Sequence, residues 1–460
     1  MSSLIASKKQ PRPFHRIGGW LPSDPKFLVA WVRQLVQDLN KKRHRSEWKD
    51  EVKDLADLIE SSAELRMLAS AMFDEVPDKP PYNEDPQGNK QIRSYAEMLD
   101  IFTEIIEKPI VPEWSEHANE VGLIGFPFNA VLDWPMATPS GYAFFLRREV
   151  NEKLKAILNR WRDDVLMTNA SQSVITTGTD GWLSPDSLKA IEDVTNIDGK
   201  DRKFTELFKC DPEHDPDHWG FQSWDSFFVR EFKDIDELRP VAEKDDPKCI
   251  VSSCESKPFA LQEDVKEFDS FWLKGQPYSV AEMLNRHEKA STFVGGTVYQ
   301  AFLSALSYHR WNSPVQGKII YSSIIDGTYF SEPPITGFPD PDPAAPDKAQ
   351  GYITHVATRA MFLIEAGDPI GLVACVYVGM ADVSTCEILE KFQQDKLPAT
   401  VEKGEEIGMF HHGGSTHCLL FPKGLELDWI KDAYPKPEDD GSETKNIPIR
   451  SKLASVSILR

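Results

Sequence analysis

A change of hydrophobic pattern near residue 225 constrains the fold of this chain more than any other feature of its sequence. Before that point, apolar residues recur every three or four positions; after it, short runs rich in β-branched residues alternate with Gly and Pro. The first pattern places apolar side chains on one face of a helix, and the second is typical of strands joined by turns. We therefore expect an α+β chain, with an N-terminal helical domain, residues 1–224, followed by an antiparallel β-rich domain, residues 225–460.

The helical half contains recognisable start signals. Asp24 is a good N-cap for a helix whose first residue is Pro25, a position that tolerates the missing N–H. Ser94 and Glu97 have the spacing of a capping box, and residues 142–167 form a longer, charged amphipathic stretch. We interpret the apolar stripes of this half as faces that pack helix on helix.

The second half is expected to contain strands at residues 249–251, 317–321, 352–356 and 371–378. Between them, residues 331–350 include six prolines, which predicts a long loop without a regular backbone. Such a loop is either a lid or binding loop, or a solvated excursion over the surface.

Two glycine-containing segments, residues 314–330 and 401–410, are similar to the two halves of biotinyl and lipoyl carrier domains. Those domains carry their cofactor on a lysine in a tight hairpin between the halves, and this chain has no Met-Lys-Met hairpin. The shared feature is a set of tight turns at glycine between short strands. The pattern predicts a small, antiparallel, barrel-like core in the β-rich half.

The composition limits the compartment and the partners. The chain of 460 residues has 52 Lys and Arg against 73 Asp and Glu, a formal net charge of −21. This balance argues against nucleic acid or an anionic membrane surface as the main partner. The chain contains no run of about 18 apolar residues, so we expect no integral membrane segment. Residues 1–9 lack the apolar stretch of a secretory signal. Six cysteines without a Cys-x-x-Cys pair favour a reducing, cytoplasmic location.

The segment His-His-Gly-Gly-Ser-Thr-His, residues 411–417, carries the chemistry, and three interpretations compete for it. A serine hydrolase elbow is disfavoured because that fold needs its acid and its histidine after the serine, and His417 is the last histidine of the chain. A metal site made of His411, His412 and His417 is disfavoured because adjacent residues of a strand point to opposite faces. We expect no metal.

The third interpretation is self-cleavage between Gly414 and Ser415. The serine hydroxyl attacks the preceding carbonyl, and the resulting ester eliminates, which releases the carboxylate of Gly414 and leaves a dehydroalanine. The dehydroalanine takes up water and loses ammonia to become a pyruvoyl group. Glycine before the serine permits a strained, exposed carbonyl, and the reaction needs a base, worth about 10²–10⁴-fold in rate. A Gly-Ser dipeptide alone is common in turns, so a second segment must decide its meaning.

That second segment is Tyr308-His-Arg-Trp-Asn-Ser-Pro-Val-Gln-Gly317. Three further segments belong with it: Gly413-Gly-Ser-Thr416, Trp224-Asp-Ser-Phe-Phe-Val-Arg-Glu-Phe232 and Val378-Gly-Met-Ala-Asp-Val383. Together they resemble the phosphatidylserine decarboxylase family, over about half of the chain. The helical first half and Cys254-Glu-Ser256 are similar to a fungal branch of that family, whose soluble members decarboxylate free amino acids such as tryptophan.

The resemblance implies roles for particular residues. Ser415 becomes a pyruvoyl prosthetic group, the only cofactor expected, and Gly414 becomes the last residue of a β chain, residues 1–414. The α chain, residues 415–460, has 46 residues and stays with the β chain through sheet pairing. His309 matches the first histidine of the family's Y-H-R-x-H motif, and it is expected to handle a proton at the substrate.

Two positions depart from the family pattern. Asn312 stands where the family has the second histidine of the motif, which acts as the base of self-cleavage. Glu255 is the nearest match to the aspartate that orients that base. Because asparagine cannot act as a base, either His309, His412 or Glu255 starts the cleavage, or cleavage is slow or absent.

The resemblance implies a carboxy-lyase that converts a free aromatic L-amino acid, with tryptophan as the first candidate, to its amine and CO₂. The substrate amine forms a Schiff base with the pyruvoyl ketone, which accepts electrons as CO₂ departs. Trp224, Trp311 and Phe338 are candidate aromatic walls of the substrate pocket, or else packing residues. Two alternatives stay open: a phosphatidylserine decarboxylase that makes phosphatidylethanolamine, and an uncleaved, non-catalytic binding protein.

Overall fold

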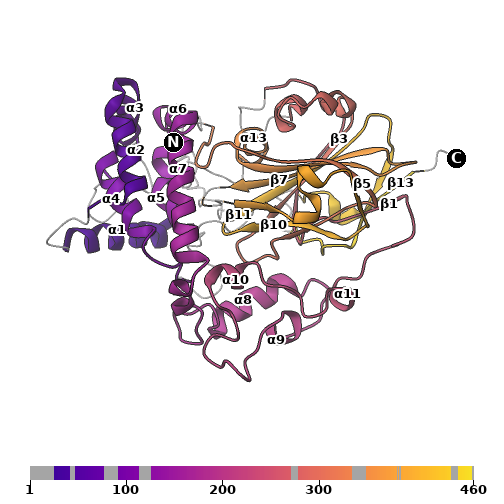
Figure 1. Ribbon diagram of the computed structural model, residues 1–460, viewed down its shortest axis with the longest axis horizontal. Coiled ribbons are helices and arrows are strands. Elements are labelled where there is room, and N and C mark those ends of the chain that lie inside the picture. Colours follow the sequence, from indigo (N-terminus) through magenta and orange to yellow (C-terminus); the bar gives the residue numbers. More distant parts are fainter. Residues whose placement is uncertain are drawn as a thin grey trace, which may run out of the picture.

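The structure is a computed structural model that separates a group of helices from a group of sheets. It describes residues 25–41, 47–76, 92–112, 126–270, 278–333, 349–380, 382, 385–436 and 444–457. Helices α1–α7 stand together on one side of the molecule, the strands form the other side, and the short helices α8–α11 lie beneath the strands in this view (Figure 1).

The helices on this side come from the first part of the chain. They are α1 (Pro25–Lys41), α2 (Asp50–Ser61), α3 (Ala63–Asp74), α4 (Tyr95–Ile105), α5 (Pro127–Met136), α6 (Pro139–Phe145) and α7 (Arg148–Trp161). The last of these continues into a π-helix, Arg162–Leu166, and is followed by α8 (Pro185–Thr195), α9 (Phe204–Leu207), α10 (Trp224–Phe228) and α11 (Ile235–Leu238).

The helix start signals are confirmed with one change of detail. Helix α1 begins at the predicted Pro25, whereas Asp24 lies outside the described residues. Ser94 caps α4 by accepting a hydrogen bond from the Glu97 amide at 3.2 Å. The Glu97 carboxylate accepts from the Arg93 amide at 2.8 Å, so the second half of the capping box is displaced by one residue.

The largest sheet is antiparallel and seven-stranded. Its order is β2 (Lys257–Gln262), β3 (Thr297–Leu303), β11 (Gly414–Phe421), β7 (Leu372–Met380), β6 (Arg359–Glu365), β5 (Gly317–Ile325) and β9 (Ala399–Val401). Two three-stranded sheets accompany it, in the orders β4 (Arg310–Asn312), β10 (Glu406–His411), β8 (Thr385–Ile388), and β1 (Cys249–Val251), β13 (Lys452–Val456), β12 (Leu427–Trp429).

The predicted barrel-like core is wrong. None of the sheets formed by the described residues closes on itself, and β2 and β9 are opposite edges of the large sheet. The chain leaves one sheet at the end of β10 and enters another at the start of β11, so the glycine-rich turn joins two sheets rather than two strands of one barrel.

Two clusters of buried apolar side chains lie on opposite faces of β11. Leu419 and Phe421 belong to a sheet-side cluster, which lies between the large sheet and the smaller ones. Cys418 and Leu420 belong to a helix-side cluster, which runs from Leu28 in α1 through the helices to the sheet. Because successive residues of a strand point to opposite faces, β11 contributes to both clusters.

One predicted strand is a helix. Residues 249–251, 317–321 and 372–378 are strands as expected, but residues 352–356 lie in α13 (Gln350–Val356). A short apolar run does not distinguish a buried strand from a buried helical turn. The predicted proline-rich loop lies outside the described residues over 334–348, and with it Phe338.

The remaining short elements complete the described chain. They are α12 (Val280–Met283) and 3₁₀ segments at Asn169–Val174, Glu288–Phe293, Glu390–Phe392, Gln394–Lys396 and Lys431–Ala433. Of the helices that the structure describes, none is both long and apolar enough to cross a bilayer.

Candidate active site

The turn between β10 and β11 holds a strained backbone directly ahead of the predicted cleavage bond. β10 ends at His411 and β11 begins at Gly414. The two residues between them have positive φ angles, 41° for His412 and 118° for Gly413. A left-handed conformation suits glycine, but for a residue with a Cβ atom it costs on the order of 1 kcal/mol. The strain therefore lies two residues before the Gly414–Ser415 bond.

Ser415 is fully buried inside the large sheet. It pairs with Leu303 of β3 on one side and with Gly379 of β7 on the other, and its side chain has 0% exposure. Its hydroxyl has no hydrogen-bond partner among the described residues. A buried polar group without a partner is costly and rare in folded proteins. A chemical role therefore explains the burial of this hydroxyl better than packing does.

His417 shares a face of β11 with Ser415, as the strand period requires. Its ring lies 6.1 Å from that of Tyr299 and 6.2 Å from that of Tyr377, measured between ring centroids. No described side chain hydrogen-bonds to either ring nitrogen, and the backbone of Ala301, its pairing partner on β3, lies beside the ring. Burial lowers the pKa of His417 to about 3, so the imidazole is neutral and keeps a lone pair that can accept a proton.

His412 occupies a box of aromatic side chains on the helix side. Its ring centroid lies 4.8 Å from Trp224, 5.0 Å from Trp161, 6.0 Å from Phe228 and 6.5 Å from Phe126. Its two ring nitrogens find no hydrogen-bond partner among the described residues. Burial lowers its pKa to about 3, which again leaves a neutral imidazole. We call these four aromatic residues the His412 box.

His309 lies against the same box. Its ring stacks on Phe228 with centroids 4.0 Å apart, so Phe228 contacts both His309 and His412. Burial, together with the nearby Arg230 and His412, lowers the pKa of His309 well below its ordinary value. The Arg230 guanidinium is itself buried and donates to the Leu306 carbonyl at 2.6 Å, next to the loop that carries His309.

His411 has the opposite environment. Its Nδ1 lies 3.0 Å from both carboxylate oxygens of Asp225, and its Nε2 lies 2.7 Å from Glu387. Burial opposes the charged form of His411, but the two carboxylates outweigh it and raise the pKa. With both nitrogens engaged, a protonated His411 has no lone pair to accept a further proton.

The side chains of Glu255 and Asn312 make their hydrogen bonds with groups other than Ser415. The Glu255 carboxylate receives the Arg239 guanidinium at 3.0 and 3.1 Å and the Ile449 amide at 2.9 Å. The Asn312 side chain donates to the Gly404 carbonyl at 2.5 Å. The structure therefore brings His309 and His412 together around Phe228. Glu255 and Asn312 instead bind backbone groups, at Ile449 and Gly404.

Two aromatic residues that were candidates for the wall of the substrate pocket, Trp224 and Trp311, lie in different parts of the structure. Trp224 is part of the His412 box. Trp311 lies in the sheet-side cluster and stacks on Tyr377, with centroids 4.3 Å apart and ring planes 2° from parallel. Because Tyr377 also contacts His417, Trp311 supports the face of β11 that carries Ser415.

Comparison with known proteins tests the predicted family. Two family models described as phosphatidylserine decarboxylase match residues 49–191 and 224–436. The chain is also 40% identical over 317 residues to Decarboxylase iboD of Amanita muscaria, which covers 66% of this chain and 87% of that protein. This chain belongs to the phosphatidylserine decarboxylase family. The predicted family is confirmed, and with it the assignment as a carboxy-lyase.

Other relatives place the chain within the family. An L-tryptophan decarboxylase of Psilocybe cubensis is 29% identical over 440 residues, 93% of this chain and 92% of that protein. Phosphatidylserine decarboxylase proenzyme 3 of Schizosaccharomyces pombe is 29% identical over 223 residues, which cover 48% of this chain and 21% of that protein. The fungal amino-acid decarboxylase is thus matched along both halves of the chain, and the phospholipid enzyme along about one half.

Sequence reasoning missed the carboxylates that hold His411 and the arginine beside His309. Asp225 and Arg230 both lie in the segment Trp224–Phe232 that carries the family resemblance. Their partners are 186 residues away at His411 and 76 residues away at Leu306. A separation of that size leaves no periodic signal, so only the fold could connect them.

Proposed function

We propose that the chain cleaves itself between Gly414 and Ser415 and that residue 415 becomes a pyruvoyl group. With it, the enzyme decarboxylates a free aromatic L-amino acid such as tryptophan to the amine and CO₂. The observation that carries the proposal is the buried Ser415 hydroxyl, which has no hydrogen-bond partner among the described residues. It follows a turn in which His412 has a left-handed backbone conformation. Relatives named L-tryptophan decarboxylase and relatives named proenzyme support it.

The residues around Ser415 fit such a group. The Ser415 hydroxyl makes no hydrogen bond with the described residues, so its conversion to a ketone would break none. The backbones of β3 and β7 would hold residue 415 on both sides. A pyruvoyl group supplies an electron sink for the charge left when CO₂ departs.

The protons are handled by neutral imidazoles in this proposal. Self-cleavage needs a base for the Ser415 hydroxyl, and we assign that role first to His417, which lies on the same face of β11. His412 is the second candidate, because it too is neutral and lies in the adjoining turn. The carboxylate of Glu255 is less suited because Arg239 and the Ile449 amide already occupy it.

His309 and His412 would act at the substrate. Both rings contact Phe228, and no described side chain hydrogen-bonds to either ring. The backbone at Ser304 and Ser307 lies beside His309, and each neutral ring keeps a lone pair that it can present to a bound molecule. Aromatic walls around His412 favour a flat, apolar substrate side chain. In this proposal Glu255 and Asn312 are positioning residues, and after cleavage Glu255 would tie the large chain to Ile449 of the small chain.

A second candidate is decarboxylation of phosphatidylserine. The family model over residues 224–436 and the phospholipid enzyme of Schizosaccharomyces pombe favour it for the strand-rich half. We favour the free amino acid because the resemblance to an L-tryptophan decarboxylase extends over 93% of the chain. We further propose that residues 1–224 and 225–460 act as helical and catalytic units of a cytoplasmic enzyme.

The cleavage is tested with Ser415→Ala. The purified variant should run as one band of full length on a denaturing gel, whereas the wild-type chain should give two. Ser323→Ala is the matched control, because Ser323 lies on β5, three strands from β11 in the sheet order, and it should be cut like the wild type. Cleavage of Ser415→Ala at the same bond would show that the hydroxyl is not the nucleophile.

The substrate is tested by CO₂ release from the cleaved enzyme. Tryptophan, other free amino acids and vesicles of phosphatidylserine are offered separately, with Ser415→Ala as the blank. We expect release from an aromatic amino acid and none above the blank from vesicles. Release from vesicles alone would select the phospholipid instead.

A further inference from the structure

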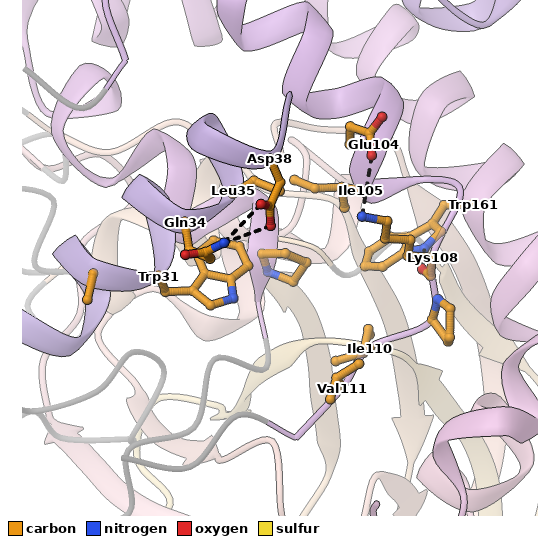
Figure 2. Close-up of a pocket in the computed structure, with 13 residues that line it drawn as sticks. Trp31, Gln34, Leu35, Asp38, Glu104, Ile105, Lys108, Ile110, Val111 and Trp161 are labelled. Carbon is orange, nitrogen blue, oxygen red and sulfur yellow. Dashed lines mark hydrogen bonds and ion pairs between the residues drawn. The ribbon is translucent and has the colours of Figure 1, made fainter. Parts of the chain in front are cut away.

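A pocket of about 480 Å³ lies among the N-terminal helices and shares one residue, Trp161, with the His412 box. Its walls come from α1, from the end of α4 and the residues that follow it, and from Trp161 at the end of α7 (Figure 2). Part of the lining is apolar and flat: the two indoles of Trp31 and Trp161, with Ile105 and Ile110. Such walls suit a planar, apolar ligand body.

The charged groups that line the pocket are two carboxylates, of Asp38 and Glu104, and one ammonium, of Lys108. Figure 2 shows Gln34 and Asp38 on one side and Glu104 with Lys108 on the other. The Glu104 carboxylate is 3% exposed and lies 3.3 Å from the Lys108 ammonium, which is its ion-pair partner. Asp38 adds a second carboxylate, so the lining carries more negative than positive charge.

Asp38 is available to a ligand although it already has partners. It accepts from Gln34 at 2.9 and 3.0 Å and from Lys41 at 3.0 Å. Its pKa is lowered by the Gln34 hydrogen bond and by Lys41, so it is ionised at neutral pH. The Lys41 side chain is 69% exposed, and an exposed ion pair of this kind contributes little. The ammonium of a ligand can therefore replace Lys41.

One indole, that of Trp161, belongs both to this pocket and to the His412 box. Trp161 lines the pocket and donates its Nε1–H to the Lys108 carbonyl at 2.8 Å. The same ring lies edge-on to His412, with centroids 5.0 Å apart. The pocket thus adjoins the proposed active site, but Ser415 is not one of the residues that line it.

We propose that this pocket binds a protonated aromatic amine, with the ring against Trp31 and the ammonium at Asp38. A cation is preferred because the lining is acidic and the whole chain carries a net charge of −21. An amino acid carries a carboxylate that would face the same acidic groups, so it binds more weakly. The link to product rests on the proposed function, since decarboxylation converts an aromatic amino acid into this class of cation.

The experiment uses the full-length Ser415→Ala chain, which cannot form the pyruvoyl group under the proposal. Calorimetry is run with tryptamine, tryptophan and indole-3-propionate, which share the ring and differ in charge. We expect tryptamine to bind most tightly. Asp38→Asn and Trp31→Ala should each raise its dissociation constant about fivefold, whereas Asp57→Asn, at an exposed position of α2, should not.

The opposite results are equally clear. Equal affinity for indole-3-propionate, no binding of tryptamine, or unchanged affinity in both pocket variants would overturn the proposal. Circular dichroism checks that each variant is folded, and Trp31→Phe replaces Trp31→Ala if the latter is not. Because the binding arm needs no cleavage, it can succeed where the decarboxylase proposal fails, and the reverse.

Discussion

The histidines near residue 415 differ in their surroundings, and this difference decides which of them can accept a proton. His411 lies between two carboxylates that raise its pKa. His412 and His417 lie in apolar surroundings that lower the pKa of each to about 3. The two carboxylates hold the His411 ring in place, and the neutral rings of His412 and His417 each keep a lone pair.

Replacing His417 tests the assignment of the base. His417→Gln should slow self-cleavage about 10²-fold, because an amide cannot take the proton of the Ser415 hydroxyl. His412→Gln is the matched variant, and it should slow cleavage less because its ring lies in the box on the helix side. The rates are measured as the appearance of the small chain after cell-free synthesis. A slower reaction in His412→Gln than in His417→Gln would move the role to His412.

The ion pairs of His411 predict a pH dependence of stability. A histidine whose pKa is raised on folding stabilises the folded state fully below its unfolded pKa, about 6.5. That contribution is lost as the pH rises through the higher, folded value. In a Ser415→Ala background, His411→Gln should lower the melting temperature at pH 6, and the difference should shrink above pH 6.5.

An exposed histidine provides the control for this measurement. His214 pairs with Asp211 at the surface, where its side chain is 83% exposed, and His214→Gln should show a smaller change. A difference between His411→Gln and its parent that stays constant across the pH range would contradict the ionic role of His411.

Individual roles were only partly readable from the sequence. The role of Ser415 and Gly414 stays a prediction, which the sequence allowed because the dipeptide lies in a recognisable motif. The partners of Glu255 could not be predicted, since the Ile449 amide is 194 residues away. Asn312 was noted only as the residue that stands in place of the family's base, and its hydrogen bond to the Gly404 carbonyl could not be predicted.

At the level of elements, β11 is the strand on which the account depends. It pairs with β3 and β7 along residues 414–421, so the proposed small chain begins in the interior of the large sheet. The same chain supplies β13, which pairs with β1 and β12. Cutting the bond before Ser415 leaves these ladders intact.

The two chains should therefore remain together after cleavage. On gel filtration without denaturant, the cleaved enzyme should elute at the same volume as uncleaved Ser415→Ala. It should separate into two chains only in denaturant, because the backbone hydrogen bonds of β11 would have to break. A small chain that is lost in native buffer would contradict this arrangement.

Elements with a clear period were predicted well, and short apolar runs were not. The stripe of α1 and the continuous apolar run of β7 gave the right structure. Residues 352–356 did not, because a run of five residues, four of them apolar or β-branched, fits either a buried strand or a turn of α13. The barrel was wrong because sheet closure depends on strand pairing, which local sequence does not specify.

Across the whole molecule, helices and sheets are joined at the proposed site. The helix-side cluster runs through both halves of the chain. Asp382, in the family segment after β7, accepts hydrogen bonds from the Phe128 and Asn129 amides at 3.0 and 3.1 Å. These amides lie at the start of α5, so a carboxylate from the strand-rich half caps a helix of the first half.

The most direct test of the central claim is the intact mass of the freshly purified wild-type chain in denaturant. The account expects two species, residues 1–414 and 415–460, with the first residue of the small chain lighter than serine by one ammonia. A single species of 460 residues, or a small chain that begins with unmodified serine, would contradict it.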